Sequence, residues 1–133
     1  MTKISRIVAR QIFDSRGNPT IEAEVFSGKV SASAICPSGA STGTYEAFEK
    51  RDKSNKKYLG KSVFKAIDLI NKKISKKLQG QNIHNQERID SIMINLDGTK
   101  QKIKLGANAI LAVSMASKKL SAKLKKNLST NVF

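Results

Sequence analysis

TIEAEVF, residues 20–26, alternates in polarity: Ile21, Ala23 and Val25 fall on one face and Glu22 and Glu24 on the other. A period of two is typical of a β-strand with one buried and one solvated face. The sequence therefore predicts a strand here, and the apolar, β-branched content of residues 4–13 and 30–36 predicts one strand on either side.

The segments between these strands are short and rich in turn formers. DSRGNP, residues 14–19, joins the first two strands, and SGK, residues 27–29, joins the second to the third. Short connections of this kind link strands that run antiparallel. We therefore expect a three-stranded antiparallel meander.

Helical periodicity begins after residues 60–62. One apolar stripe is followed by Gly80, which stops a helix. A second helical stretch starts near 82–85, passes through Ile89 and Met93 and ends at Asp97 and Gly98, and a third covers 107–124. The expected class is α+β, with three or more helices on one face of the sheet. The first stripe consists of Val63, Ile67, Ile70, Ile74 and Leu78.

The charge is large for 133 residues, a length that suits one domain. Lysine and arginine exceed aspartate and glutamate by 15, and every acidic residue lies at or before Asp97. Such an imbalance invites a nucleic-acid interpretation. The chain has 20 lysines, five arginines and no tryptophan, whereas nucleic-acid recognition favours arginine forks and aromatic platforms. We favour solvated charge over RNA binding.

Cys36 is the only cysteine, which excludes an internal disulfide and a cysteine-cluster metal site. The sequence begins without an apolar signal core and holds no uncharged apolar run that could span a bilayer. We expect a cytoplasmic protein that does not enter a membrane.

PSGASTGTYEAFEKRD, residues 37–52, begins with small and hydroxyl residues that allow close approach to a charged ligand. Its GASTG core also fits the G-x-S-x-G pattern of serine hydrolases. A hydrolase needs a parallel sheet, an acid and a histidine, and the nominal candidates are Asp52 or Asp68 and His84. The antiparallel pattern argues against that sheet, and His84 lies at an expected helix start.

Three stretches together resemble the amino-terminal domain of enolase, the glycolytic phosphopyruvate hydratase. They are ARQIFDSRGNPT at 9–20, the small-residue stretch at 37–52, and LGANAILAVS at 105–114. The resemblance covers nearly the whole chain, 1–133, and fades over 121–133. It implies a lyase that dehydrates 2-phosphoglycerate reversibly to phosphoenolpyruvate with two Mg²⁺ ions, and a homodimer.

The resemblance also implies roles for particular residues. Ser41 would supply oxygen ligands to the second, substrate-associated Mg²⁺, a hard cation that prefers oxygen donors. Arg10 and Glu22 would form ion pairs across the dimer interface. Gly39 and Gly43 are plausible hinges of a loop that closes over the active site. The residues of that loop are Ser38, Gly39, Ala40, Ser41, Thr42 and Gly43.

In enolases the catalytic base, the acid and the carboxylates of the first Mg²⁺ belong to a carboxyl-terminal barrel that these 133 residues do not contain. We therefore expect no catalytic residue in this chain and no activity from it alone, as for a fragment or a truncated or frameshifted gene. Two alternatives stay open: a small basic RNA-binding or scaffold protein, and a degenerate remnant without catalysis.

Overall fold

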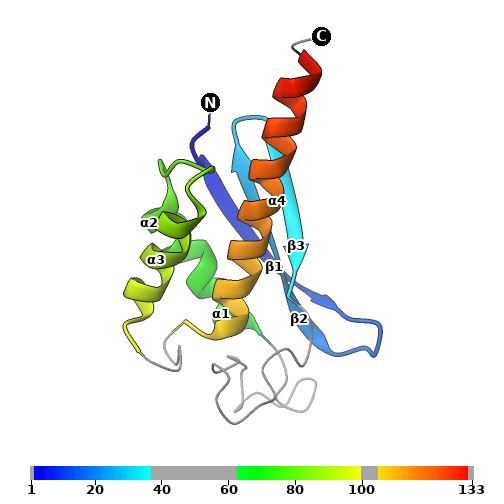
Figure 1. Cartoon of the computed structure of the whole chain (residues 1–133). Coiled ribbons are helices and arrows are strands. Elements are labelled where there is room, and N and C mark those ends of the chain that lie inside the picture. The colour runs from blue at the N-terminus through cyan, green and yellow to red at the C-terminus, as the bar shows by residue number, and fades with distance from the viewer. Residues whose placement is uncertain (1, 37–62, 100–104, 132–133) are drawn as a thin grey trace.

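The computed structural model describes residues 2–36, 63–99 and 105–131, with side chains through Lys126. Figure 1 shows a single sheet whose one face is covered by helices, with the long carboxyl-terminal helix lying across it. The expected α+β class, with a three-stranded antiparallel meander followed by helices, is confirmed.

The sheet contains β1 (Arg6–Phe13), β2 (Pro19–Ser27) and β3 (Val30–Ile35), in the order β1-β2-β3. Both pairings are antiparallel, and Ala23 of β2 lies opposite Ala9 of β1 and Ala34 of β3. These three small side chains are buried beneath the helices. The predicted alternation of β2 is confirmed, because its apolar positions are fully buried and its two glutamates lie on the opposite face.

The first helical segment is one continuous run made of α1 (Phe64–Leu69), η2 (Ile70–Ile74) and α2 (Ser75–Leu78). All five residues of the predicted stripe are buried, and Gly80 follows the last turn with a φ of 88°. The periodicity did not indicate that η2 is a π-helical turn. The stripe residues are spaced by three and four positions, as in an ordinary α-helix, so the spacing does not indicate this turn.

The next helix is α3 (Gln86–Asp97). It begins later than the predicted 82–85, because the side chain of Asn85 acts as the N-cap and accepts a hydrogen bond from the Arg88 N–H at 3.2 Å. Gly98 ends it in the left-handed conformation, with φ of 71°, as predicted.

The last helix, α4 (Ala107–Asn131), extends beyond the predicted end at Leu124. Its buried positions face β2, β3 and the other helices, and small residues allow the close approach. They are Asn108, Ala109, Ala112, Val113, Ala116, Ser117 and Leu120. No helix among the described residues is both long and apolar enough to cross a membrane.

The amino-terminal segment fastens the connection between α2 and α3 to the sheet. The Ile4 N–H donates to the Gln81 carbonyl at 2.9 Å, and the Ile4 carbonyl accepts from the Gly80 N–H at 2.8 Å. The Ile83 N–H donates to the Thr2 carbonyl at 2.7 Å. Ile4 and Ile83 are themselves buried, so this connection is held by both backbone bonds and core packing.

Candidate functional site

The small-residue stretch at 37–52, which includes Ser38–Gly43, lies outside the described residues, but Cys36 and Val63 on either side of 37–62 are described. On the entry side, the Cys36 N–H donates to the Ile21 carbonyl at 2.9 Å, and the Thr20 hydroxyl donates to the Cys36 carbonyl at 2.7 Å. On the exit side, the Val63 N–H donates to the Gln11 side chain at 3.0 Å. Both flanks are therefore fixed to the same end of the β1–β2 pair.

The β1–β2 connection at the same end of the sheet is built around Asp14. One carboxylate oxygen, Oδ1, accepts from the N–H groups of Arg16 and Asn18, each at 2.9 Å. The Asp14 N–H donates to the Asn18 carbonyl at 2.9 Å, and Gly17 takes the left-handed conformation that the turn requires. The predicted turn is present, and the Asp14 side chain caps it.

Arg10 and Glu22 lie opposite each other on β1 and β2, on the sheet face away from the helices. The Arg10 guanidinium donates to Glu22 at 2.6 Å and to Glu24 at 2.8 Å, and the second oxygen of Glu24 accepts from the Ser31 hydroxyl at 2.7 Å. The Arg10 side chain is 43% exposed, against 21% for Glu22. Within the chain, these two residues pair with each other.

The charges of this cluster stabilise one another. The hydrogen bond to Glu24, and to a smaller extent that to Glu22, raises the pKa of the Arg10 guanidinium above its ordinary value. The hydrogen bond from Arg10, and to a smaller extent that from Ser31, lowers the pKa of the Glu24 carboxyl below its ordinary value. Arg10 and Glu24 thus each favour the charged form of the other. Beside it, the Arg6 guanidinium lies 4.0 Å from the centre of the Phe26 ring.

Asp97 is a buried carboxylate that joins the end of α3 to the start of α4. One oxygen accepts from the Leu105 N–H at 2.7 Å, and the other accepts from the N–H of Thr99 at 3.0 Å and from its hydroxyl. The side chain is completely buried. A buried carboxylate that receives these donors has a structural explanation, because it satisfies backbone groups that would otherwise lose hydrogen bonds.

His84 does not approach a carboxylate among the contacts described. Its Nδ1 lies 2.7 Å from the Ser121 hydroxyl of α4. Ser41 and Asp52 lie outside the described residues, and the exposed Asp68 pairs with Lys72 at 3.1 Å. The sheet is antiparallel, so the parallel framework of a nucleophile elbow is not formed by the strands in the described ranges.

In the parts of the chain that the structure describes, no group of three His, Cys, Asp or Glu side chains lies close enough together to hold a metal ion. The predicted metal ligand, Ser41, is outside those parts, and its role stays a prediction. The same holds for the other residues of Ser38–Gly43.

Sequence reasoning missed three of the features described above. The first is that Glu24, as well as Glu22, binds Arg10. Glu24 lies two residues after Glu22 on the same face of β2, and this spacing could have indicated the contact. The second is that Ser31 of β3 also binds Glu24. Predicting this contact requires knowledge of the register between β2 and β3. Asp97 was interpreted as part of a helix stop, and nothing in its sequence context indicates that Leu105 returns to it.

The comparisons with known proteins agree on one family. The family model "Enolase, N-terminal domain" matches residues 4–130. The chain is 78% identical over 125 residues to an enolase of Pelagibacter ubique (strain HTCC1062), covering 94% of this chain and 30% of that protein. It is 53% identical over 119 residues to an enolase of Methanococcoides burtonii (strain DSM 6242), covering 90% of this chain and 28% of that one.

The chain therefore spans less than a third of the length of these relatives. Its meander of three strands, its following helices and its sequence all point to the same part of the larger protein. The 133 residues belong to the family of enolase amino-terminal domains.

Proposed function

We propose that this chain serves as the amino-terminal domain of an enolase, which dehydrates 2-phosphoglycerate reversibly to phosphoenolpyruvate with Mg²⁺. The observation that carries the proposal is the match of residues 4–130 to the family, together with 78% identity to an enolase. In this role the domain contributes the active-site loop and part of a homodimer interface, and the catalytic groups come from the larger remainder of the enzyme.

The proposed task of the loop is to bring Ser41 to the second Mg²⁺. Serine hydroxyl and carbonyl oxygens are hard donors of the kind that Mg²⁺ prefers, and the ion completes its shell with water and substrate oxygens. The anchored flanks support this task. With Cys36 fixed to β2 and Val63 fixed to Gln11 of β1, any loop between them starts and ends on a firm support.

The proposed dimer contact involves Arg10 and Glu22. Their intrachain pair lies at the surface, where an ion pair contributes about 0–1 kcal/mol. Because that energy is small, a partner subunit could replace either bond at little cost. The proposed contribution of these residues is therefore the geometry of association more than its strength.

A chimaera tests the proposal directly. Residues 1–133 would be joined to the remainder of the Pelagibacter ubique enolase in place of the corresponding segment, and phosphoenolpyruvate formation would be followed by its ultraviolet absorbance. We expect Mg²⁺-dependent turnover from the chimaera and none from the 133-residue chain alone. A folded chimaera without turnover would refute the functional assignment, and turnover by the isolated chain would refute its expected inactivity.

Within the chimaera, Ser41→Ala tests the metal role. We expect it to need a higher Mg²⁺ concentration for half-maximal rate, while the thermal unfolding midpoint stays unchanged. Ser91→Ala is the matched control, because Ser91 is an exposed serine on α3. Identical Mg²⁺ titrations for the two variants would remove Ser41 from the metal site.

The large positive charge keeps RNA binding as a second candidate. A protein that neutralises several phosphates loses affinity steeply as salt rises. Titration of a labelled oligouridylate with the chain at two salt concentrations separates the cases. Binding that persists near physiological ionic strength with a steep salt slope would support RNA as a partner, and its absence there would leave the charge as solvation.

A further inference from the structure

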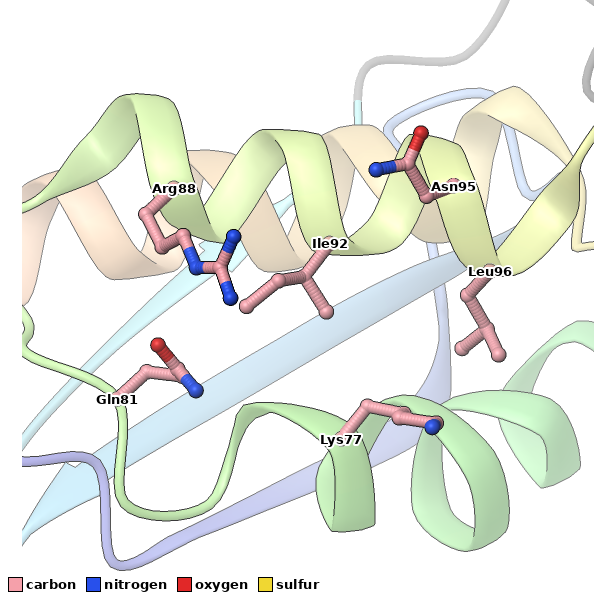
Figure 2. A pocket seen from close by; sticks show the side chains of 6 residues that line it. All are labelled: Lys77, Gln81, Arg88, Ile92, Asn95 and Leu96. Carbon is pink, nitrogen blue, oxygen red and sulfur yellow. The ribbon is translucent and has the colours of Figure 1, made fainter.

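A groove between α2 and α3 contains none of the residues to which the proposed enolase function assigns a role. It has a volume of about 490 Å³ and is lined by Lys77, Gln81, Arg88, Ile92, Asn95 and Leu96. In Figure 2 the side chains of Arg88, Ile92 and Leu96 extend from α3 toward α2, and those of Lys77 and Gln81 lie on the facing wall.

The groove combines an apolar floor with two cationic side chains, Lys77 and Arg88. Ile92 and Leu96 are half-buried and pack against the core. Among the described residues, neither Lys77 nor Arg88 forms an ion pair with a carboxylate. Each is therefore available to an anionic ligand that comes from outside.

The carboxylates of α3 lie away from the groove. Asp90 accepts a hydrogen bond from Gln86, whose amide also contacts Ser114 of α4, and Asp97 is buried against the start of α4. In a helix of 3.6 residues per turn, positions 88, 92, 95 and 96 fall within an arc of about 100°, and Glu87 falls outside it. The surface that α3 presents to the groove is cationic and apolar.

The walls of the groove are fixed. The backbone of Gln81 is held from both sides, because its carbonyl accepts from the Ile4 N–H at 2.9 Å and its N–H donates to the Leu78 carbonyl at 3.0 Å. On the other wall, Asn85 caps the first turn of α3. A ligand would therefore enter a preformed surface and would not have to order it.

We propose that this groove binds an acidic peptide segment of a partner protein, with an aliphatic or aromatic side chain of the peptide on Ile92 and Leu96. Lys77 and Arg88 would pair with its carboxylates, and the amides of Gln81 and Asn95 would bond to its backbone. A peptide fits better than RNA, because the groove offers an aliphatic floor and the described residues that line it include no aromatic side chain on which a base could stack. It also fits better than a small molecule, because the groove is open to solvent and would not enclose a small ligand.

The test uses fluorescein-labelled Glu-Asp-Leu-Glu-Phe-Asp-Glu and the 133-residue chain, with binding measured by fluorescence anisotropy at physiological salt. Two further peptides serve as probes of the chemistry, one with every acid replaced by its amide and one with serine in place of leucine and phenylalanine. We expect both to bind more weakly than the parent peptide. If the parent peptide does not bind, or if either replacement binds equally well, the proposal is wrong.

Matched variants locate the binding. Arg88→Glu and Lys118→Glu change the net charge equally, but Lys118 is exposed on α4, outside the groove. We expect Arg88→Glu to weaken peptide binding by about tenfold and Lys118→Glu by less than about twofold. Equal losses would mean nonspecific attraction to the +15 charge and would overturn the proposal.

Ile92→Gln probes the floor, with circular dichroism to confirm that the variant is folded. We expect weaker binding with retained helix content. If Ile92→Gln does not fold, backbone amide shifts of the unmodified chain during peptide titration give the answer, because they should cluster at Lys77, Ile92 and Leu96. Amide shifts confined to other regions would overturn the peptide assignment. It would also be overturned if an oligouridylate displaced the peptide and Arg88→Glu weakened binding of the oligouridylate as much as binding of the peptide.

Discussion

Replacing Asp97 by alanine should destabilise the chain strongly, although this residue has no part in the proposed chemistry. The side chain is fully buried and accepts the buried Leu105 N–H at 2.7 Å and the Thr99 N–H at 3.0 Å. A hydrogen bond to an ionised group contributes about 1.5–3 kcal/mol, and a buried donor left without an acceptor costs about 1–3 kcal/mol. Thr99 is half-exposed and can turn to water, so the Leu105 N–H dominates the loss.

We therefore expect Asp97→Ala to lower the free energy of unfolding by about 3 kcal/mol, a large share of the roughly 5–15 kcal/mol typical of a domain. Asp97→Asn keeps the shape and one acceptor oxygen, and it should cost about half as much. Urea denaturation followed by circular dichroism measures both, provided that the slope of the free energy against urea is unchanged.

Asp68→Ala is the matched control. Asp68 is also an aspartate in a helix, but its side chain is 59% exposed and its one described ion pair is with Lys72. An exposed pair of this kind contributes about 0.3–0.5 kcal/mol. If Asp97→Ala costs no more than Asp68→Ala, the carboxylate does not join α3 to α4 in the way described, and the reasoning fails.

Three other changes test the sheet, the core and a helix end. The pKa of Glu24 is lowered from 4.5 on folding, so the stabilisation it provides is complete above about pH 4.5 and is lost as the pH falls through the lowered value. In urea midpoints measured against pH, Glu24→Gln should therefore reduce the loss of stability at acid pH. An unchanged loss would contradict the assignment. Ile74→Ala should cost about 3 kcal/mol by urea denaturation, because its side chain is fully buried, and a loss near zero would show that η2 is not packed as described. Gly98→Ala should lower the free energy of unfolding by about 1 kcal/mol. Among the described residues, the added Cβ would meet only the Asn95 carbonyl, at an ordinary 3.7 Å, so the cost comes from the φ of 71°. A neutral or stabilising effect in the same assay would contradict this reasoning.

The parts of the fold that the sequence predicted well are those governed by local periodicity. The alternation around Ala23 fixes which side of β2 is buried, and the stripe from Val63 to Leu78 fixes the inner face of the first helical run. Gly80 and Gly98 mark helix ends because a positive φ is strained for any residue with a Cβ. Each of these signals is complete within one element.

The parts that it did not predict depend on where two distant segments meet. The resemblance predicts that Arg10 pairs with a second subunit. Within the chain, Arg10 bonds to Glu22, because the strand register places these two residues opposite each other. The interchain role remains a proposal. The groove between α2 and α3 escaped prediction for the same reason, since Lys77 and Arg88 are ordinary surface cations until the Gly80–Asn85 connection places them on facing walls.

The π-helical turn η2 contains a further contact between distant segments, from Asn71 to Ala9 of β1. Asn71 lies within it, and its side-chain amide accepts from the Ala9 N–H at 2.8 Å and donates to the Ala9 carbonyl at 3.3 Å. In the sheet formed by the described strands, β1 lies at an edge, and an unpaired edge would leave these two groups open to another chain. The amide thus takes the place of one residue of a neighbouring strand. η2 thus places the Asn71 amide against the sheet edge, a contact that the apolar periodicity of the helix does not indicate.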